Sequence, residues 1–432
     1  MNAKAALSLS SIPGADDITR VTLQNGIVVL VRENPNSLSV TLRGYLPAGS
    51  LLDPDDKLGL ADFVADGLLR GTAKREFQAI YDALESIGAN FGFSSGTHTV
   101  GFGGKSLAED LPLLLDVLNE GLRAPVFPSD QVEKLRAQLL TGLALRAQDT
   151  RDMASLLFDE LVYRQHPYSR PEEGHPETVG AITLDDLVAF HRTVYGPRGM
   201  VLAVVGGIKA EQAVDLVRAT LEDWTNAAQV PSPQLPPWEA LPERVYKRHA
   251  IPGKSQSDLI VGTAGPPRSA PDFMAANLGN SILGRFGLMG RVGDAVREKA
   301  GLAYYAYSNL SGGTGPGAWD LAAGVNPANE KKAIDLIFKE LERFTADLVD
   351  EEELSDSQSN FIGSMPLSLE SNGGVADAML NIERYQLGLD YYRLYPRLVQ
   401  SVTREQVRAA ARFYLQVDRL AVAVAGPPPI EV

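Results

Sequence analysis

The chain repeats one stretch of sequence, and this repeat decides its fold: Thr183-Leu-Asp-Asp-Leu187 through Met200-Val-Leu-Ala-Val-Val-Gly206 aligns without a gap to Thr403-Arg-Glu-Gln-Val407 through Leu420-Ala-Val-Ala-Val-Ala-Gly426. Each copy is typical of a Thr N-cap, an amphipathic helix, a short turn and a buried strand that ends in Gly. The constant offset indicates a duplication, so we predict two homologous halves, each an α+β unit.

A proline-rich segment separates the two copies. Gln229-Val-Pro-Ser-Pro-Gln-Leu-Pro-Pro-Trp238 contains four prolines, which favour an extended, semi-rigid connector over a packed element. We therefore predict an N-terminal half over residues 1–228, a linker over 229–242 and a C-terminal half over 243–432. A ligand chamber is expected in the gap between two such halves.

Strand and helix patterns alternate irregularly along the N-terminal half. Asn25-Gly26 is a type I′ hairpin signal within the strand-like residues 21–32, and further strand-like runs cover 39–48 and 90–102. Helical periodicity covers four segments, residues 59–70, 76–86, 107–121 and 129–148. These spacings do not fit a simple parallel sheet. In the C-terminal half, the glycine-rich residues 311–317 lack the ending of a phosphate-binding loop and are expected to form a hairpin loop, with a substrate-facing loop as the alternative.

Composition and charge exclude several classes of function. The chain has no cysteine, which excludes disulfides, a thiol nucleophile and a thiolate zinc site. Its net charge of −14, with scattered basic residues, argues against a nucleic-acid partner. No window is long and apolar enough for a membrane span. Residues 4–12 resemble a signal peptide only faintly, so we expect a cytoplasmic rather than a periplasmic protein.

The histidines do not form a helical metal site. The chain has five histidines: His98, His166, His175, His191 and His249. None of them lies four residues from another or belongs to a His-x-x-Glu-His run. No Gly-x-Ser-x-Gly elbow nominates a nucleophilic serine either.

The most informative helix is Gly59-Leu-Ala-Asp-Phe-Val-Ala-Asp-Gly-Leu-Leu-Arg-Gly-Thr72. It resembles the active-site helix of the pitrilysin/insulinase (inverzincin) family, which reads Gly-Leu-Ala-His-Phe-x-Glu-His-x-x-x-x-Gly-Thr. In that family the two histidines bind zinc and the glutamate polarises the attacking water. The resemblance spans nearly the whole chain. It implies two halves, each a mainly antiparallel sheet covered by helices, that face each other as a clamshell.

The chemical groups of this motif are absent. The resemblance places Asp62 and Asp66 at the histidine positions, Ala65 at the glutamate position and Gly142 at the position of the third zinc ligand. It therefore implies that this chain holds no metal or other cofactor. Two alternatives remain for the aspartates: a hard cation, which needs six or more oxygens, or acid/base chemistry in an autonomous enzyme. Otherwise they are exposed or cavity-lining polar residues.

The C-terminal half retains a second signature of the family. Gly290-Arg-Val-Gly-Asp-Ala-Val-Arg297-Glu-Lys-Ala-Gly301-Leu-Ala-Tyr304 resembles a helix that ends in Leu-Arg-Glu-x-x-Gly-Leu-x-Tyr. In the family, this Arg and Tyr bind the substrate backbone and stabilise the oxyanion, and a guanidinium and a phenol suit that role. Arg297 and Tyr304 are therefore the candidate catalytic and substrate-binding residues. The alternative is a helix-surface arginine and a core tyrosine.

This combination resembles one subunit of a two-chain bacterial peptidase. The resemblance implies a non-catalytic subunit that supplies Arg297 and Tyr304 in trans, while a homologous partner with a His-x-x-Glu-His helix provides zinc and the general base. The implied substrate is a peptide or unfolded polypeptide, paired with an edge strand for which Gly88-Ala-Asn-Phe-Gly92 is a vestigial candidate. Without its partner, the chain is open to forming a homodimer. The main alternative is a purely structural or peptide-binding scaffold subunit of the same family.

Overall fold

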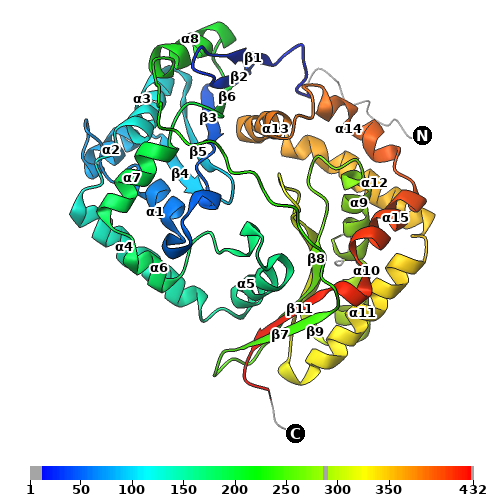
Figure 1. Cartoon of the computed structure of the whole chain (residues 1–432). Coiled ribbons are helices and arrows are strands. Elements are labelled where there is room, and N and C mark those ends of the chain that lie inside the picture. The colour runs from blue at the N-terminus through cyan, green and yellow to red at the C-terminus, as the bar shows by residue number, and fades with distance from the viewer. Residues whose placement is uncertain (1–11, 286–289, 430–432) are drawn as a thin grey trace. The chain divides into compact units, whose positions relative to one another are not determined.

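The computed structural model describes residues 12–285 and 290–429, and it divides into two compact units (Figure 1). Unit 1 comprises Met1–Leu143, Pro171–Gln234 and Met365–Leu394, and unit 2 comprises Ala144–Arg170, Leu235–Ser364 and Tyr395–Val432. Each unit contains one mainly antiparallel sheet covered by helices. The predicted α+β fold class is therefore confirmed.

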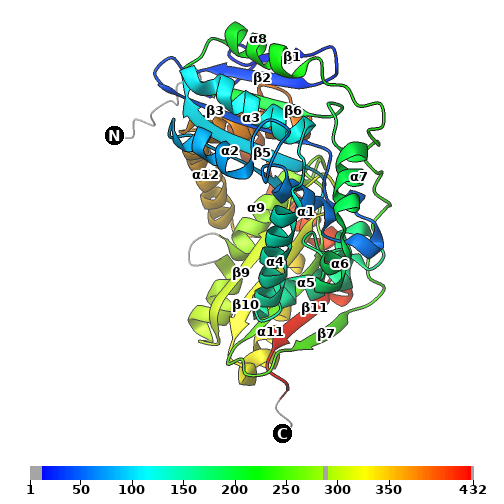
Figure 2. The same ribbon diagram turned by 90° about the vertical axis from the view of Figure 1, so that its left-hand side faces the viewer.

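Unit 1 is built on a six-stranded sheet with the strand order β1-β2-β6-β3-β5-β4. Its strands are β1 Thr19–Thr22, β2 Val28–Glu33, β3 Ser39–Leu46, β4 Asn90–Ser95, β5 Val100–Leu107 and β6 Val201–Gly206. The helices that lie wholly or mostly in this unit are α1 Leu60–Gly67, α2 Phe77–Glu85, α3 Leu111–Arg123, α4 Ser129–Arg146, α6 Pro176–Ala181, α7 Leu184–Val194, α8 Ala210–Leu221 and α13 Asn372–Arg384. Figure 2 shows α3 lying over β3 and β5, and α2 packs against β4 and α3.

Unit 2 is built on a five-stranded sheet with the order β7-β11-β8-β10-β9. Its strands are β7 Val245–Ala250, β8 Ser257–Ala264, β9 Ala303–Leu310, β10 Ala318–Val325 and β11 Ala421–Gly426. Its helices are α5 Thr150–Tyr163, α9 Phe273–Gly284, α10 Gly290–Val292, the π-helical η6 Gly293–Lys299, α11 Glu330–Ala346, α12 Glu351–Ser368, α14 Tyr391–Gln400 and α15 Arg404–Tyr414, of which α12 and α14 lie mostly in this unit.

The sequence repeat corresponds to the same helix and strand in each unit. Thr183 and Thr403 both cap a helix, and each forms a reciprocal capping box with the residue three positions later. The strands that follow, β6 and β11, are buried along their whole length. Strand β6 pairs in parallel with β2 and antiparallel with β3, just as β11 pairs in parallel with β7 and antiparallel with β8. The duplication predicted from the sequence is therefore a duplication of topology.

Two helices are exchanged relative to the predicted halves. Helix α5 belongs to the N-terminal sequence but packs in unit 2, where its Ala154 and Phe158 lie in one cluster with Ala421 and Ala423 of β11. Helix α13 belongs to the C-terminal sequence but lies in unit 1, against β6 and β3. Because β6 and β11 are apolar on both faces, each sheet needs a helix on its second face, and the exchanged helices provide it.

The proline-rich linker has no helix or strand, but its ends are fixed. The Gln229 side chain accepts a hydrogen bond from the Arg198 backbone N–H and donates one to the Arg198 carbonyl, at 3.1 and 3.0 Å. The indole N–H of Trp238 donates to the Val162 carbonyl at 3.0 Å. The boundary between the units falls between Gln234 and Leu235, within the predicted linker. The predicted division into residues 1–228 and 243–432 concerns homology between the two halves of the sequence. It remains a prediction, since each compact unit contains segments from both halves.

The first hairpin forms as predicted, but its turn differs. Strands β1 and β2 pair antiparallel, and the Gly26 backbone N–H donates to the Leu23 carbonyl. Only Gly26 has a positive φ, of 92°, whereas a type I′ turn requires positive values at both Asn25 and Gly26. The type I′ prediction is therefore wrong, because an additional residue, Gln24, takes part in the loop. The predicted hairpin loop at residues 311–317 is confirmed, since it joins the antiparallel strands β9 and β10.

No helix in the described part of the chain is long and apolar enough to cross a membrane. The stretch compared with a signal peptide lies outside the described residues except for Ile12.

The capping boxes predict a measurable loss of stability. The Thr403 hydroxyl accepts a hydrogen bond from the Gln406 backbone N–H at 3.3 Å, and the Gln406 side chain accepts one from Thr403 at 2.9 Å. We expect Thr403→Ala to lower the free energy of unfolding by about 1 kcal/mol. Thr403→Ser keeps the cap and should stay close to wild type in urea unfolding. Equal losses in both variants would contradict this role for the hydroxyl.

Candidate functional site

Helix α1 retains the family's framework for structural reasons. Its N-cap, Gly59, has a φ of 93°, and a Cβ there would lie 2.7 Å from the Glu173 carbonyl oxygen, so only glycine fits. The buried carboxylate of Asp53 accepts hydrogen bonds from the backbone N–H groups of Gly59 and Ala61, at 2.9 and 2.8 Å. Leu60 and Phe63 lie in the core. The helix is therefore held firmly in place even though its catalytic groups are missing.

The two aspartates at the histidine positions lie one helical turn apart on α1. Burial, and after it the negative charge of Asp66, raises the pKa of Asp62 to about 7. Burial also raises the pKa of Asp66, and the nearby positive charge of Arg70 opposes that shift. Asp62 is thus largely protonated below neutral pH, whereas a metal-ligating carboxylate must be ionised.

These residues do not fit a zinc ion. Ala65 offers no donor, and Gly142 on α4 is exposed, with no atom near enough to crowd a Cβ. The missing third ligand is therefore not explained by a steric need for glycine. Within residues 12–285 and 290–429, no group of three His, Cys, Asp or Glu side chains is placed to hold a metal. Protein zinc sites use at least three protein ligands, so Asp62 and Asp66 alone are too few.

The second predicted pair lies in unit 2, around the turn from η6 into β9. Val296 anchors η6 in the core, while the Arg297 side chain is 39% exposed. Its one ion pair within the described structure is with its neighbour Glu298, at 3.6 Å between Nε and Oε1. Gly301, with a φ of 64°, then reverses the chain into β9. The Arg297 guanidinium is therefore held on a fixed backbone but is not committed to a strong internal partner.

Tyr304 is the second residue of β9, an edge strand of the unit 2 sheet, and it is 85% exposed. Within the described residues its side chain makes no hydrogen bond or ring contact. The alternative of a core tyrosine is therefore wrong. A phenol this exposed has to be satisfied by water or by a ligand, so the position can serve binding at little cost to the fold.

The predicted substrate-pairing segment is also at a sheet edge. Among the described strands, β4 pairs only with β5. The preceding Gly88 has a φ of 63°, close to that of Gly301 before β9. The prediction that this segment forms an edge strand is therefore confirmed. Its unpaired backbone groups are a template for a further strand.

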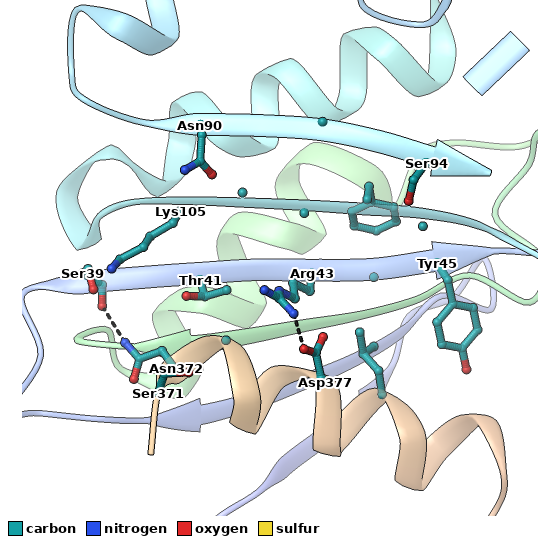
Figure 3. A pocket seen from close by; sticks show the side chains of 18 of the residues that line it. Ser39, Thr41, Arg43, Tyr45, Asn90, Ser94, Lys105, Ser371, Asn372 and Asp377 are labelled. Carbon is teal, nitrogen blue, oxygen red and sulfur yellow. Dashed lines mark hydrogen bonds and ion pairs between the residues drawn. The ribbon is translucent and has the colours of Figure 1, made fainter. Parts of the chain in front are cut away.

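One feature of unit 1 was not predicted from the sequence. A groove of about 1180 Å³ lies over β3, β4 and β5 beside α13 (Figure 3). Its floor includes Gly92, Gly101 and Gly103, and polar side chains surround it. Glycines within residues 101–104 could have signalled a close approach to a strand, but the register that aligns them with Gly92 follows only from the fold.

Two family descriptions match consecutive parts of this sequence. Residues 28–173 match "Insulinase (Peptidase family M16)" and residues 181–361 match "Peptidase M16 inactive domain". The chain belongs to peptidase family M16. The resemblance to insulinase and pitrilysin is therefore confirmed, over the segments that contain both α1 and the Arg297–Tyr304 signature.

Two relatives and one solved structure are similar to this chain over nearly its whole length. A protein named "uncharacterized zinc protease" from Streptomyces coelicolor is 27% identical over 96% of this chain and 90% of its own. The mitochondrial-processing peptidase subunit beta of Saccharomyces cerevisiae is 24% identical over 94% and 90%. A crystal structure described as a peptidase M16 inactive domain from Pseudomonas fluorescens is 27% identical, covers 95% of this chain and 98% of its own, and has a TM-score of 0.86. This chain is thus an M16 peptidase-like protein.

The raised pKa of Asp62 gives a testable dependence on pH. Its folded pKa of about 7 exceeds the ordinary value of 3.8, so its destabilising effect grows as pH rises between these values and is complete above pH 7. We expect Asp62→Asn to raise the free energy of unfolding by on the order of 2 kcal/mol at pH 8 and by much less at pH 4.5. Thermal unfolding at both pH values measures this. The exposed Asp56→Asn is the control, and a gain independent of pH would contradict the assignment.

Proposed function

We propose that this chain is the non-catalytic subunit of a heterodimeric zinc metalloendopeptidase. One contrast carries the proposal. Unit 1 keeps the framework of the active-site helix but has lost both histidines, the glutamate and the third ligand, whereas unit 2 keeps Arg297 and exposes Tyr304. A chain that served only as a scaffold would have no chemical reason to keep an exposed tyrosine seven residues after an arginine.

In this proposal the zinc ion and the general base belong to a homologous M16 partner with a His-x-x-Glu-His helix, and this chain itself needs no cofactor. Arg297 and Tyr304 bind the backbone of a peptide or unfolded polypeptide. They also donate hydrogen bonds to the oxyanion that forms when water attacks the scissile carbonyl. The relative that is named as a subunit beta supports assembly with a second chain. We place the complex in the cytoplasm.

Arg297 and Tyr304 differ in what they contribute. A guanidinium carries a permanent charge and several donors in one plane, so it can hold a backbone carbonyl before the reaction and the oxyanion during it. A phenol offers a single donor, which matters most when the oxygen becomes charged. Loss of Tyr304 should therefore reduce kcat more than it changes KM, whereas loss of Arg297 should affect both.

The proposal predicts trans-complementation of activity. Hydrolysis of a quenched fluorescent peptide mixture, with added zinc, should be absent for this chain alone and present once the His-x-x-Glu-His partner is added. Tyr304→Phe and Arg297→Ala should each lower kcat/KM of the mixture by about a hundredfold or more, since each removes an oxyanion donor.

Two matched variants control for indirect effects. Tyr246 is an exposed tyrosine on β7, the opposite edge of the same sheet, and Arg412 is exposed on α15. Tyr246→Phe and Arg412→Ala should leave the mixture fully active. If the mixture is active and insensitive to Arg297 and Tyr304, the scaffold function replaces the proposal. If this chain cleaves peptides alone and Asp66→Ala abolishes that activity, the autonomous acid/base enzyme replaces it.

A further inference from the structure

The two sheets can be compared position by position because their strand orders correspond. Val205 on β6 matches Ala425 on β11 in the sequence repeat, and each lies opposite the next strand at Thr41 and Asp258. Following the register across the next two strands, Asn90 on β4 corresponds to Tyr305 on β9. Two residues further along, Gly92 corresponds to Tyr307. The edge strands therefore present different side chains on the same face.

In unit 2 these positions are filled. The Tyr305 hydroxyl donates a hydrogen bond to the Asp258 carboxylate. The guanidinium of Arg151, on the covering helix α5, lies 4.5 Å from the ring centre of Tyr305 and 5.7 Å from that of Tyr307. The aromatic rings and the helix thus close this part of the sheet.

In unit 1 the corresponding face is open. Helix α13 covers β6 and β3, and beyond it the floor consists of Gly92, Gly101 and Gly103. A Cβ added at Gly92 would meet no atom within 4 Å, so no residue that the structure describes fills the space above it. This is the groove of Figure 3, and all the residues that line it belong to unit 1.

A row of three polar side chains crosses the groove. Thr41, Lys105 and Asn90 lie directly opposite one another on β3, β5 and β4, so their side chains share one face of the sheet. None of the three has a side-chain hydrogen bond or ion pair with any residue that the structure describes. Thr41 is only 5% exposed, and its hydroxyl still lacks an internal partner. A hydroxyl, an ammonium and an amide together can donate several hydrogen bonds to one carboxylate.

The other charges of the groove are mostly compensated. Arg43 forms an ion pair with Asp377, and the guanidinium of Arg384 lies 4.1 Å from the ring centre of Tyr45. Glu370, before the start of α13, also lines the groove. Lys105 is therefore the cation of the groove that has no partner among the described residues, in a chain whose net charge is −14. The groove favours an anionic group at this row.

The shape of the groove favours an extended polypeptide. Its lining runs along β3 from Ser39 to Tyr45, which matches about six to seven residues of extended chain at roughly 3.3 Å per residue. The lining continues on both sides of the Thr41 row, to Ser37 at one side and to Ser94 at the other. A carboxylate bound in the middle of such a groove belongs to a side chain, because a chain terminus would leave half of the groove unused.

We propose that this groove binds an extended segment of a polypeptide and holds an Asp or Glu side chain of that segment on Thr41, Lys105 and Asn90. As a substrate-recognition site it rests on the proposed peptidase function, and it adds a preference for an acidic residue in the bound segment. The open floor at Gly92 lets the peptide backbone approach the sheet closely, where unit 2 has the ring of Tyr307.

Isothermal titration calorimetry on the full-length chain tests this site without any need for activity. The probe is the peptide Ala-Ser-Ala-Glu-Ala-Ser-Ala with both ends blocked, and its reference has Gln in place of Glu. We expect the Glu peptide to bind at least about tenfold more tightly, because only it pairs with the Lys105 ammonium. Lys105→Met should remove that difference. Gly92→Tyr, which copies the unit 2 residue into open space, should abolish binding of both peptides.

Lys332→Met is the matched control, since Lys332 is an exposed lysine of α11 in unit 2 without an internal partner among the described residues. It should leave binding unchanged. Equal binding of Glu and Gln peptides, binding that survives Gly92→Tyr, or no binding at all would each overturn the proposal. A Gln peptide with a free C-terminal carboxylate that binds as tightly as the blocked Glu peptide would overturn the side-chain assignment. The activity of the two-chain mixture is a separate result, so either proposal can fail alone.

Discussion

Burial of both faces of β6 and β11 is the constraint on which the rest of the structure depends. A strand with no polar face requires apolar cover above and below the sheet. In each unit, helices from the same half of the sequence cover one face, and a single helix from the other half covers the second. Alanines at 421, 423 and 425 let α5 approach β11 closely, and the corresponding β6 face receives α13. A single covering helix cannot span a whole sheet, which explains why the outer strands keep an uncovered face. That face is closed by tyrosines in unit 2 and left as a groove in unit 1.

Much of the architecture followed from the sequence because the deciding signals are local. The Thr caps, the apolar strands and the helical periodicity of α1 to α4 each depend on short stretches, and all of them appear where predicted. The exchange of α5 and α13 could not be predicted from the sequence, since the apolar face of a helix can pack on either sheet. The hairpin turn was misjudged for a related reason: Asn25-Gly26 is compatible with two loop lengths, and the pairing of Leu23 with Ile27 decides between them.

The candidate sites show the same limit. Asp62, Asp66 and Gly142 could be placed by resemblance, yet the raised pKa of Asp62 depends on burial and on Asp66 together, which only the folded arrangement reveals. The exposure of Tyr304 was likewise undecidable from a pattern that suits a core strand equally well. Thr41 lies far from Asn90 and Lys105 in the sequence, and only the strand register brings the three into one row. Local motifs therefore identified the family, while cross-strand geometry was needed to find the groove.

The exchange of α5 and α13 also affects how the chain can be cut or assembled. Five covalent connections pass between the two units, near residues 143, 170, 234, 364 and 394, so the exposed linker is not the sole tether. Proteolytic cleavage of the proline-rich segment would leave two fragments that stay associated, because each fragment provides a helix to the other fragment's sheet. Both hydrophobic cores would remain intact. By the same logic, a gene split at that segment would yield two polypeptides that must fold around each other, because each would lack the helix that completes one of its faces. Duplication thus produced a protein whose two halves are homologous in sequence but do not correspond to two independently folding domains.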